Sequence, residues 1–207
     1  MSDRRMIHIV DDEEAIRRSA SFMLKTSGFE VRTWASGVAL LKEARAIEPG
    51  CILLDVRMPD MDGLEVQQAL TDAGIAMPVI VLTGHGDITI AVRAMKAGAI
   101  DFLEKPFEKA RLLDAIAAGF AQLHDKAGRA SRAHDASTAI ARLTDRERDV
   151  LEGLADGLPN KTIAFDLGIS PRTVEVHRAN LMSKLEVRSL SDALRLAFAA
   201  GVGRADK

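Results

Sequence analysis

Three acidic side chains, one hydroxyl group and one lysine follow short apolar segments in the first half of the chain. They are Asp11, Asp12, Asp55, Thr83 and Lys105. Carboxylates packed together repel one another unless a cation joins them, and oxygen ligands without nearby His or Cys favour Mg²⁺ or Mn²⁺. An ammonium group and a hydroxyl group beside them would suit a phosphoryl group. These residue types therefore predict a site that handles phosphate.

Each of these residues also has an ordinary structural explanation. Asp55 could begin a turn or cap the next helix, because Pro59 and Gly63 follow it closely. Lys105 could be a solvated surface lysine, and Thr83 could be a β-branched residue at the end of a strand. A chain without a site would require all of these explanations at once. A shared site is therefore the better hypothesis.

The surrounding segments predict a parallel α/β domain. Apolar runs that are typical of strands buried on both faces alternate five times with segments of helical periodicity. The predicted strands are 6–10, 31–35, 51–55, 78–82 and 100–103. The predicted helices run from the acidic cluster 11–14 to about residue 27 and over 36–45, 63–73, 87–97 and 108–123. In the first helix the apolar pattern comprises Ala15, Ile16, Ala20, Phe22, Met23 and Leu24.

Strict alternation indicates a flavodoxin-like (βα)5 fold, which is a doubly wound parallel sheet with helices on both faces. In such a sheet, the first and third strands flank the point at which the strand order reverses. Asp11, Asp12 and Asp55 are therefore expected to converge on one crevice at the carboxyl ends of these strands.

Residues 6–122 resemble the receiver domain of bacterial response regulators. The resemblance rests on Asp11-Asp12, on Leu-Leu-Asp-Val-Arg-Met-Pro-Asp-Met-Asp-Gly around Asp55, on Thr83-Gly84 and on Lys105-Pro106-Phe107. It implies that Asp55 accepts a phosphoryl group from a phosphohistidine on a separate sensor histidine kinase. Such a protein catalyses only its own phosphoryl transfer and autodephosphorylation, so we do not expect an enzyme in the usual sense.

The same resemblance implies roles for the neighbouring residues. Asp12, Asp55 and the backbone carbonyl of Arg57 would bind Mg²⁺ (or Mn²⁺), and Asp11 would take part through water. Thr83 and Lys105 would contact the phosphoryl oxygens, and the Lys105–Pro106 bond would be cis.

A switch is also implied by the resemblance. Thr83 would move toward the phosphoryl group, and Phe102 would change its rotamer in response, although an ordinary core position explains Phe102 equally well. The loop Gly84-His85-Gly86-Asp87 contains two glycines and can move. The face formed by the fourth helix and the fifth strand, residues 88–103, would then change shape and support a homodimer.

Charge is distributed unevenly along the chain. Residues 1–122 hold 14 basic and 18 acidic side chains, residues 123–142 hold four and two, and residues 143–207 hold 10 of each. This difference predicts two domains with different roles, 1–122 and 143–207, joined by a linker over 123–142. The linker is rich in alanine and polar residues, and it either extends the fifth helix or forms a flexible tether.

Cysteine content and hydropathy exclude several classes of protein. Cys51 is the only cysteine, which excludes a disulfide framework within one chain, and its place in a buried strand favours a core thiol. No apolar run approaches the length of a membrane span, and the N-terminus lacks the apolar segment of a signal peptide. We therefore expect a cytoplasmic protein with no membrane partner.

The last part of the chain predicts an all-α domain of four helices. The predicted helices are 144–157, 160–168, 170–185 and 190–200. Thr144 and Glu147 form a capping box, Gly168 closes the second helix, and Ser170-Pro171 is a start signal for the third. A short helix, a glycine turn and a second helix make a helix-turn-helix.

The third of these helices has two contrasting faces. At 100° per residue, Val174, Leu181 and Leu185 form an apolar stripe. Side chains on the opposite face suit the base edges of the major groove of DNA; they are Arg172, Glu175, Val176 and Ala179. A flank suited to DNA phosphates comprises Thr173, His177, Asn180 and Lys184, together with Lys161 of the preceding helix. His177 could equally be a packed histidine.

Residues 143–200 resemble the LuxR-type DNA-binding domain, through Leu-Thr-Asp-Arg-Glu-Arg-Asp-Val-Leu, Asn-Lys-Thr-Ile-Ala and Ser-Pro-Arg-Thr-Val-Glu-Val-His-Arg. The whole chain resembles the FixJ branch of response regulators. The resemblance implies a two-component transcriptional regulator in which phosphorylation of Asp55 leads to dimerisation and binding of promoter DNA. RNA polymerase is a candidate partner. Because the domain carries no net charge, one copy should bind DNA weakly, so we expect a dimer on two half-sites.

Two other hypotheses remain open. The first half could be a permanently folded dimerisation or inhibitory module whose DNA binding does not depend on phosphate, although the complete set of five site residues argues against this. It could also be a phosphatase-like enzyme, which would need a general acid that the sequence does not supply. DNA binding measured with and without a phosphodonor tests the first alternative. Release of phosphate from a small monoester tests the second.

Overall fold

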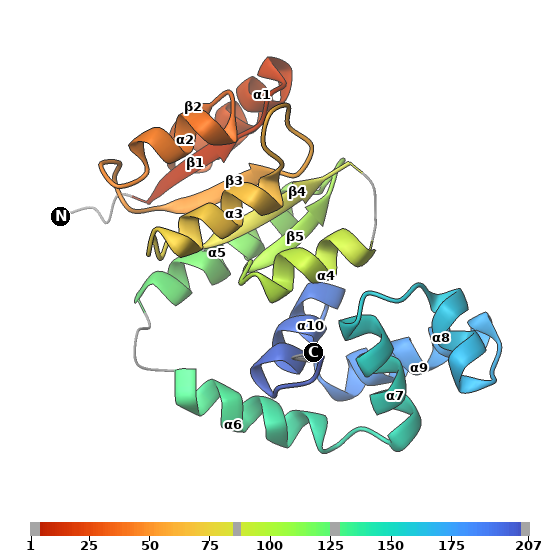
Figure 1. Cartoon of the computed structure of the whole chain (residues 1–207). Coiled ribbons are helices and arrows are strands. Elements are labelled where there is room, and N and C mark those ends of the chain that lie inside the picture. Colours follow the sequence, from red (N-terminus) through yellow and green to blue (C-terminus); the bar gives the residue numbers. More distant parts are fainter. Residues whose placement is uncertain (1–4, 85–87, 125–128, 204–207) are drawn as a thin grey trace. The chain divides into compact units, whose positions relative to one another are not determined.

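In a computed structural model of the chain, residues 5–84, 88–124 and 129–203 are described (Figure 1). Internal contacts divide the chain into two compact units. The first unit comprises residues 1–86 and 97–125, and the second comprises residues 87–96 and 126–207. This division assigns α4 (Ile88–Lys96) to the second unit, although it connects β4 to β5 in the sequence.

A five-stranded parallel sheet in the order β2-β1-β3-β4-β5 forms the first unit. The strands are β1 (Met6–Val10), β2 (Glu30–Trp34), β3 (Cys51–Asp55), β4 (Val79–Thr83) and β5 (Asp101–Glu104). Every residue of β3 and β4 is buried, in keeping with sequences that are apolar up to the last residue of each strand rather than alternating. The predicted fold class is confirmed, and β2, β4 and β5 differ from the predicted ranges by one residue.

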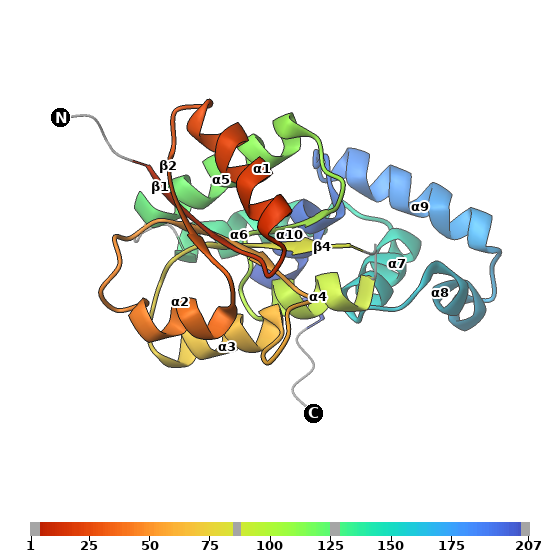
Figure 2. The same cartoon turned by 90° about the horizontal axis from the view of Figure 1, so that it is seen from above.

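Helices cover both faces of this sheet. The helices of the first unit are α1 (Glu14–Lys25), α2 (Gly37–Glu43), α3 (Gly63–Asp72) and α5 (Lys109–His124). Figure 2 shows α1 and α5 on one face and α2 and α3 on the other. On the first face, Leu53 packs in one buried cluster with Leu24 of α1 and Ile116 of α5.

The apolar pattern of α1 is only partly a core pattern. Ala20 and Leu24, four residues apart, are buried, as expected for one helical face. Phe22 lies about 200° around the helix from Ala20, and its side chain is 73% exposed. The six apolar residues therefore cover more than one face, and Phe22 does not belong to the core.

The second unit is entirely helical in its described residues. Its helices after α4 are α6 (Arg129–Ile140), α7 (Asp145–Ala155), α8 (Asn160–Leu167), α9 (Pro171–Lys184) and α10 (Leu190–Ala199). The four predicted helices correspond to α7–α10. The segment 123–142, whose conformation the sequence leaves open, contains the separate helix α6. Ala136 and Ile140, which are four residues apart in α6, are buried, so part of the predicted linker contributes to the core of this unit.

Local signals in the sequence set the ends of these helices. Thr144 and Glu147 form the predicted capping box of α7, and Ser170 caps α9 with Pro171 in its first turn. Gly168 adopts the left-handed conformation (φ +64°) between α8 and α9, a conformation that costs glycine little. These features complete the predicted helix-turn-helix.

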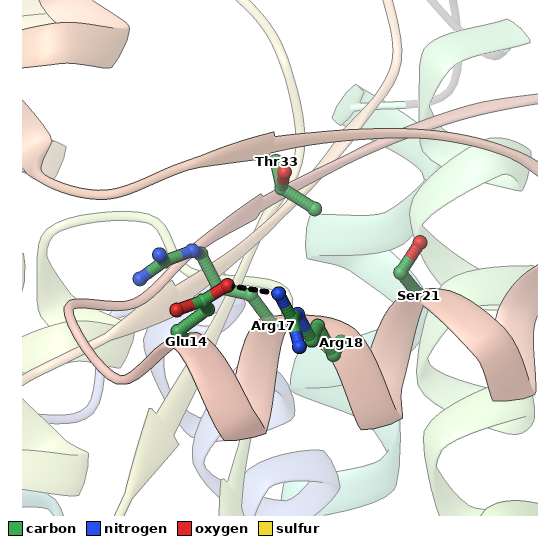
Figure 3. A pocket seen from close by; sticks show the side chains of 5 residues that line it. All are labelled: Glu14, Arg17, Arg18, Ser21 and Thr33. Carbon is green, nitrogen blue, oxygen red and sulfur yellow. Dashed lines mark ion pairs between the residues drawn. The ribbon is translucent and has the colours of Figure 1, made fainter.

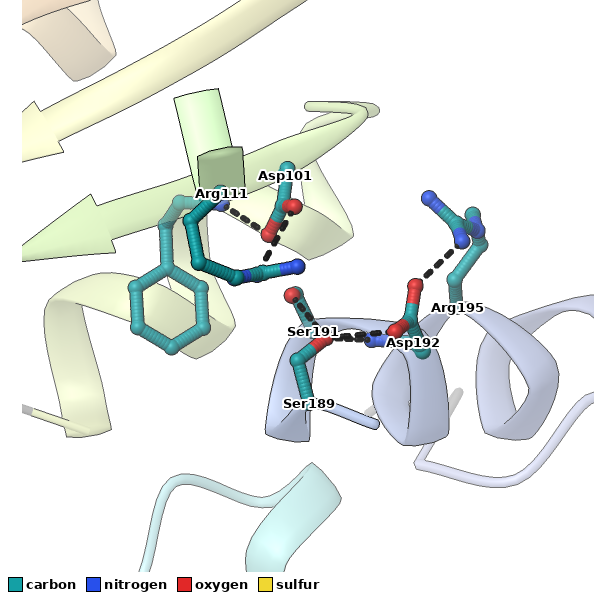
Figure 4. A network of polar contacts seen from close by, with 7 residues as sticks. Asp101, Arg111, Ser189, Ser191, Asp192 and Arg195 are labelled. Carbon is teal, nitrogen blue, oxygen red and sulfur yellow. Dashed lines mark hydrogen bonds and ion pairs between the residues drawn. The ribbon is translucent and has the colours of Figure 1, made fainter. Parts of the chain in front are cut away.

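Polar contacts also fix individual elements within each unit. In the second unit, Ser189 accepts a hydrogen bond from the backbone N–H of Asp192 at the start of α10, and Arg195 pairs with Asp192 at 2.6 Å (Figure 4). In the first unit, Arg111 lies 3.2 Å from the Asp101 carboxylate. Among the described residues, no helix is both long enough and apolar enough to span a membrane.

Candidate functional site

The parallel strand order places the carboxyl ends of β1, β3, β4 and β5 next to one another. Asp55 is the last residue of β3 and Thr83 is the last residue of β4, whereas Asp11 and Lys105 directly follow β1 and β5. β1 pairs with β3, β3 with β4, and β4 with β5. Four of the predicted site residues therefore lie along one edge of the sheet.

The ammonium group of Lys105 joins two of these carboxylates. Its Nζ atom donates to Oδ1 of Asp55 at 2.6 Å and to Oδ2 of Asp11 at 2.7 Å. The side chains of Asp55 and Asp11 are 8% and 1% exposed, and that of Lys105 is 19% exposed. Because little water reaches the three groups, these charge-assisted hydrogen bonds are strong. The structure thus brings together Asp11, Asp55 and Lys105.

Backbone contacts fix the position of Asp11. Its N–H donates to the carbonyl oxygen of Trp34 at 3.2 Å, and its Oδ1 atom accepts from the backbone N–H of Glu13 at 2.9 Å. One carboxylate oxygen thus contacts the loop after β1 and the other contacts Lys105. Asp11 therefore links β2, the β1–α1 loop and the end of β5.

Burial changes the acidity of both partners of the central ion pair. Loss of solvation raises the pKa of Asp55, and the hydrogen bond and charge of Lys105 offset only part of this effect. Burial lowers the pKa of Lys105, but its hydrogen bonds to Asp11 and Asp55 outweigh burial and raise that pKa overall. At neutral pH the lysine is therefore protonated, and it places a positive charge beside the Asp55 carboxyl group.

A tight turn after β3 supports the Asp55 backbone. Gly63 donates its N–H to the carbonyl of Val56 at 2.9 Å, and a Cβ atom on Gly63 would lie 2.2 Å from the carbonyl oxygen of Asp55. Asp62, and not Asp55, caps α3, and it does so in a capping box with Glu65. The alternative explanation of Asp55 as a helix cap is therefore wrong.

Thr83 and Phe102 have environments that differ in exposure. Thr83 is 2% exposed at the end of β4, whereas Phe102 is partly exposed in β5. The Lys105–Pro106 bond is cis, as the resemblance implies. His85, Gly86 and Asp87 of the expected mobile loop lie outside the described residues.

The expected convergence of three carboxylates is not seen. In the described part of the chain, no three His, Cys, Asp or Glu side chains gather closely enough to hold a metal ion. Asp12 is exposed, whereas Asp11 and Asp55 share the Lys105 ammonium group. Lys105 thus joins two of the three acids.

The donor atoms at this edge nevertheless fit a divalent cation. Carboxylate oxygens of Asp12 and Asp55 and the backbone carbonyl of Arg57 are hard ligands, and Mg²⁺ takes few such protein ligands together with several waters. Cys51 does not add a soft ligand, because burial raises the pKa of its thiol to about 12. The chemistry of the site is therefore that of oxygen ligands.

The two faces of α9 differ as the sequence predicts. Val174, Leu181 and Leu185 are buried, whereas the opposite face is exposed. The exposed residues on that face are Arg172, Glu175, Val176 and Ala179. Arg172 pairs with Glu175 at 2.8 Å, with side chains 84% and 51% exposed. Such an exposed pair is weak, so both side chains can separate to reach other partners.

The residues predicted to contact phosphates have different environments. Asn180 and Lys161 are exposed, and Thr173 and His177 are partly exposed. Lys184, by contrast, is held within its own unit, because its Nζ atom lies 2.7 Å from a carboxylate oxygen of the buried Glu147. The charge of Lys184 is therefore already paired before any DNA is present.

Two arginine contacts are absent from the sequence-based predictions. Arg178 of α9 donates to Oδ1 of Asn160 at 2.9 Å, which ties α9 to the start of α8. Arg17 of α1 donates to backbone carbonyls in the β1–α1 loop. Neither contact has a recognisable sequence signal, because the first joins residues 18 positions apart and the second depends on the path of the short β1–α1 loop.

Comparison with known proteins agrees with this architecture. Residues 7–117 match the family of response regulator receiver domains, and residues 141–197 match the luxR family of bacterial regulatory proteins. The chain is 47% identical over 206 residues to the transcriptional regulatory protein FixJ of Azorhizobium caulinodans, covering 100% of this chain and 98% of that protein. It is 48% identical over 197 residues to FixJ of Rhizobium meliloti, covering 95% and 97% of the two chains.

A solved structure of a FixJ protein also matches this chain over nearly its whole length. Crystalline full-length FixJ from B. japonicum has a TM-score of 0.58 and 44% sequence identity to this chain, and the match covers 95% of this chain and 97% of that one.

Proposed function

Because this chain belongs to the FixJ-type response regulators, in which a receiver domain is joined to a LuxR-family DNA-binding domain, we propose that Asp55 is its phosphoacceptor. As a member of this family, the protein is a transcriptional regulator and not a conventional enzyme, and it has a histidine kinase and DNA as partners. The proposal assigns phosphorylation to the carboxylate of Asp55 and DNA binding to α9.

The buried contact between Asp55 and Lys105 supports this proposal most strongly. In the transfer, a carboxylate oxygen of Asp55 forms a bond to phosphorus while the bond to the kinase histidine nitrogen breaks. Negative charge is spread over the phosphoryl oxygens in such a transition state, so positioned cations stabilise it. The Lys105 ammonium group, 2.6 Å from Oδ1 of Asp55, is in place to do this, and the hydroxyl group of Thr83 would bind another phosphoryl oxygen.

Receiver domains generally use Mg²⁺, and the residues at this edge fit it. We assign the cation to the carboxylates of Asp12 and Asp55 and the carbonyl of Arg57, with Asp11 taking part through water. When bound, the ion would supply positive charge against the phosphoryl oxygens. The hydrogen bond from Lys105 to Oδ1 orients the Asp55 carboxylate.

Phosphorylation would act on the rest of the chain through Thr83 and Phe102. A phosphoryl group adds a charge of about −1.5 to −2 and three acceptor oxygens, which favours movement of the Thr83 hydroxyl group toward it. The partly exposed Phe102 would then change its rotamer, and two copies of the protein would form a homodimer through the segment 88–103. Two copies of α9 would then bind two half-sites of a promoter, which compensates for the lack of net charge in this part of the chain.

The experiment is a DNA-binding titration of the full-length protein. A duplex is first selected from a random-sequence pool by protein treated with acetyl phosphate and Mg²⁺, and affinity is then measured with and without the phosphodonor. We expect tighter binding by phosphorylated wild type, no response in Asp55→Asn, and a normal response in Asp60→Asn, which replaces an exposed acid of the same loop. The proposal fails if wild type binds the duplex equally well in both conditions.

A further inference from the structure

Arg17 contacts the acidic loop through its backbone rather than through its carboxylates. The guanidinium Nη1 atom donates to the carbonyl oxygen of Asp11 at 2.7 Å and to that of Asp12 at 2.8 Å. Arg17 itself is fixed in the first turn of α1, where its N–H donates to the carbonyl of Glu13 at 3.1 Å. A single side chain therefore joins α1 to two consecutive peptide groups after β1.

These two hydrogen bonds matter more for Asp12 than for Asp11. Asp11 is also held by Trp34, Glu13 and Lys105. For Asp12, the bond from Arg17 is the one hydrogen bond found within the described part of the chain. Arg17 therefore fixes the peptide group of Asp12, and this peptide group in turn sets the position of the exposed Asp12 carboxylate.

The next residue in the chain provides a natural comparison. Arg18 carries the same charge, but its guanidinium group pairs with Glu14 at 2.5 Å and its side chain is 80% exposed. Figure 3 shows this ion pair between Glu14 and Arg18. Arg17 and Arg18 both line one hollow between α1 and β2, but Arg17 is partly buried and holds the loop, whereas Arg18 is exposed and pairs with Glu14.

We propose that Arg17 is a positioning residue for the divalent cation, because it fixes the loop that carries the Asp12 and Asp11 carboxylates. This inference rests on the proposed assignment of Mg²⁺ to that edge of the sheet. Two effects of Arg17 oppose each other. Its positive charge weakens cation binding, whereas its hold on the two carbonyls strengthens it by ordering the ligands. Contacts that orient metal ligands are typically worth about tenfold or more in affinity, so ordering outweighs the solvent-screened charge effect.

The test compares Mg²⁺ affinity in variants of the full-length protein, measured by titration calorimetry without any phosphodonor. Arg17→Met keeps the apolar stem but removes the donors, and Arg18→Met is the matched loss of charge. We expect about tenfold weaker Mg²⁺ binding in Arg17→Met, affinity equal to or slightly above wild type in Arg18→Met, and partial recovery in Arg17→Lys. Thermal unfolding in EDTA shows which variants are folded.

Whether the Mg²⁺ affinity of Arg17→Met is lower than that of wild type decides the proposal. If Arg17→Met binds Mg²⁺ as tightly as wild type, or more tightly as loss of charge alone would produce, Arg17 has no positioning role. If Arg17→Met does not fold, Arg17→Ala, which also removes the donors, decides, and wild-type affinity in that variant overturns the proposal. Failure of wild type itself to bind Mg²⁺ would overturn the assignment of the cation, whereas binding that is equal in all variants removes only the role of Arg17.

Discussion

The Nζ atom of Lys105 lies 2.6 Å from Oδ1 of Asp55, and the same nitrogen also binds the carboxylate of Asp11. One cation therefore serves two buried acids, and the exposed acid Asp12 is close to them in sequence. Such an arrangement is not optimal for stability, because the two buried negative charges of Asp11 and Asp55 share a single positive charge. Unbalanced charge of this kind is typical of sites that bind a further cation or a reacting group.

Replacement of Asp55 by Asn should therefore stabilise the metal-free protein. Burial raises the pKa of Asp55 above its ordinary value of 3.8, so the ionised form opposes folding at neutral pH. We expect Asp55→Asn to raise the free energy of unfolding by about 1 kcal/mol at pH 7. The gain should shrink as the pH falls through the raised pKa and vanish below 3.8, where wild type is neutral in both states.

Urea unfolding in EDTA at a series of pH values measures this difference. Asp60→Asn is the control, because Asp60 is exposed and its positive φ of 71° suits asparagine as well as aspartate. Equal stability of Asp55→Asn and wild type at pH 7 would show that Lys105 fully compensates the buried charge.

Gly63 is the position at which a single methyl group should disturb Asp55 most directly. Its Cβ would overlap the backbone carbonyl of Asp55, so Gly63→Ala forces the β3–α3 turn to move. We expect a loss of about 1–3 kcal/mol in the free energy of unfolding, together with slower labelling by acetyl phosphate. Gly84→Ala is the control for stability, because a Cβ there meets no atom within 4 Å. Wild-type stability in Gly63→Ala would mean that the turn adapts freely.

Local patterns account for much of what the sequence predicts correctly. β3 and β4 are recognisable because strands buried on both faces are apolar throughout, and the starts of α7 and α9 are marked by Thr144 and Ser170, whose side chains cap them. The sheet edge with Asp11, Asp55 and Lys105 follows from strand order alone. Each of these features depends on residues that are near one another in the sequence or on a general rule of parallel sheets.

Features that depend on long-range packing are not predicted. Glu147 is recognisable as part of a capping box, but its contact with Lys184 joins residues 37 positions apart. Phe22 belongs to an apolar pattern that spans more than one face of α1. The exposure of Asp12 likewise has no signal in the sequence.

The contact between Glu147 and Lys184 predicts an acid-sensitive second unit. The hydrogen bond from Lys184 is the main reason that the pKa of Glu147 is lowered from 4.5 to about 2. The stabilisation is therefore fully present above pH 4.5 and is lost as the pH falls toward 2. Because the Lys184 side chain is 40% exposed, solvent screening limits the contribution to about 1 kcal/mol.

Glu147→Gln isolates the charge, because glutamine can keep the capping box. We expect this variant to be about 1 kcal/mol less stable than wild type at pH 7, with the difference closing between pH 4.5 and 2. Urea unfolding followed by circular dichroism measures it, and Glu152→Gln, an exposed acid of the same helix, should behave as wild type. A difference that persists unchanged to low pH would assign the effect to packing rather than to charge.

Lys184 and Lys161 should have separable roles in DNA binding. Lys161 is exposed, and no hydrogen bond or ion pair of its side chain is found in the described part of the chain, whereas Lys184 is bound to Glu147. We expect Lys161→Met to reduce the slope of log affinity against log salt by about 1 without changing stability.

Lys184→Met should instead lower the free energy of unfolding by about 1 kcal/mol, because it leaves a buried carboxylate unpaired, and should leave the salt slope unchanged. Titrations of the phosphorylated full-length protein with its selected duplex at several salt concentrations measure both slopes. A reduced slope in Lys184→Met would show that the lysine leaves Glu147 and binds a DNA phosphate.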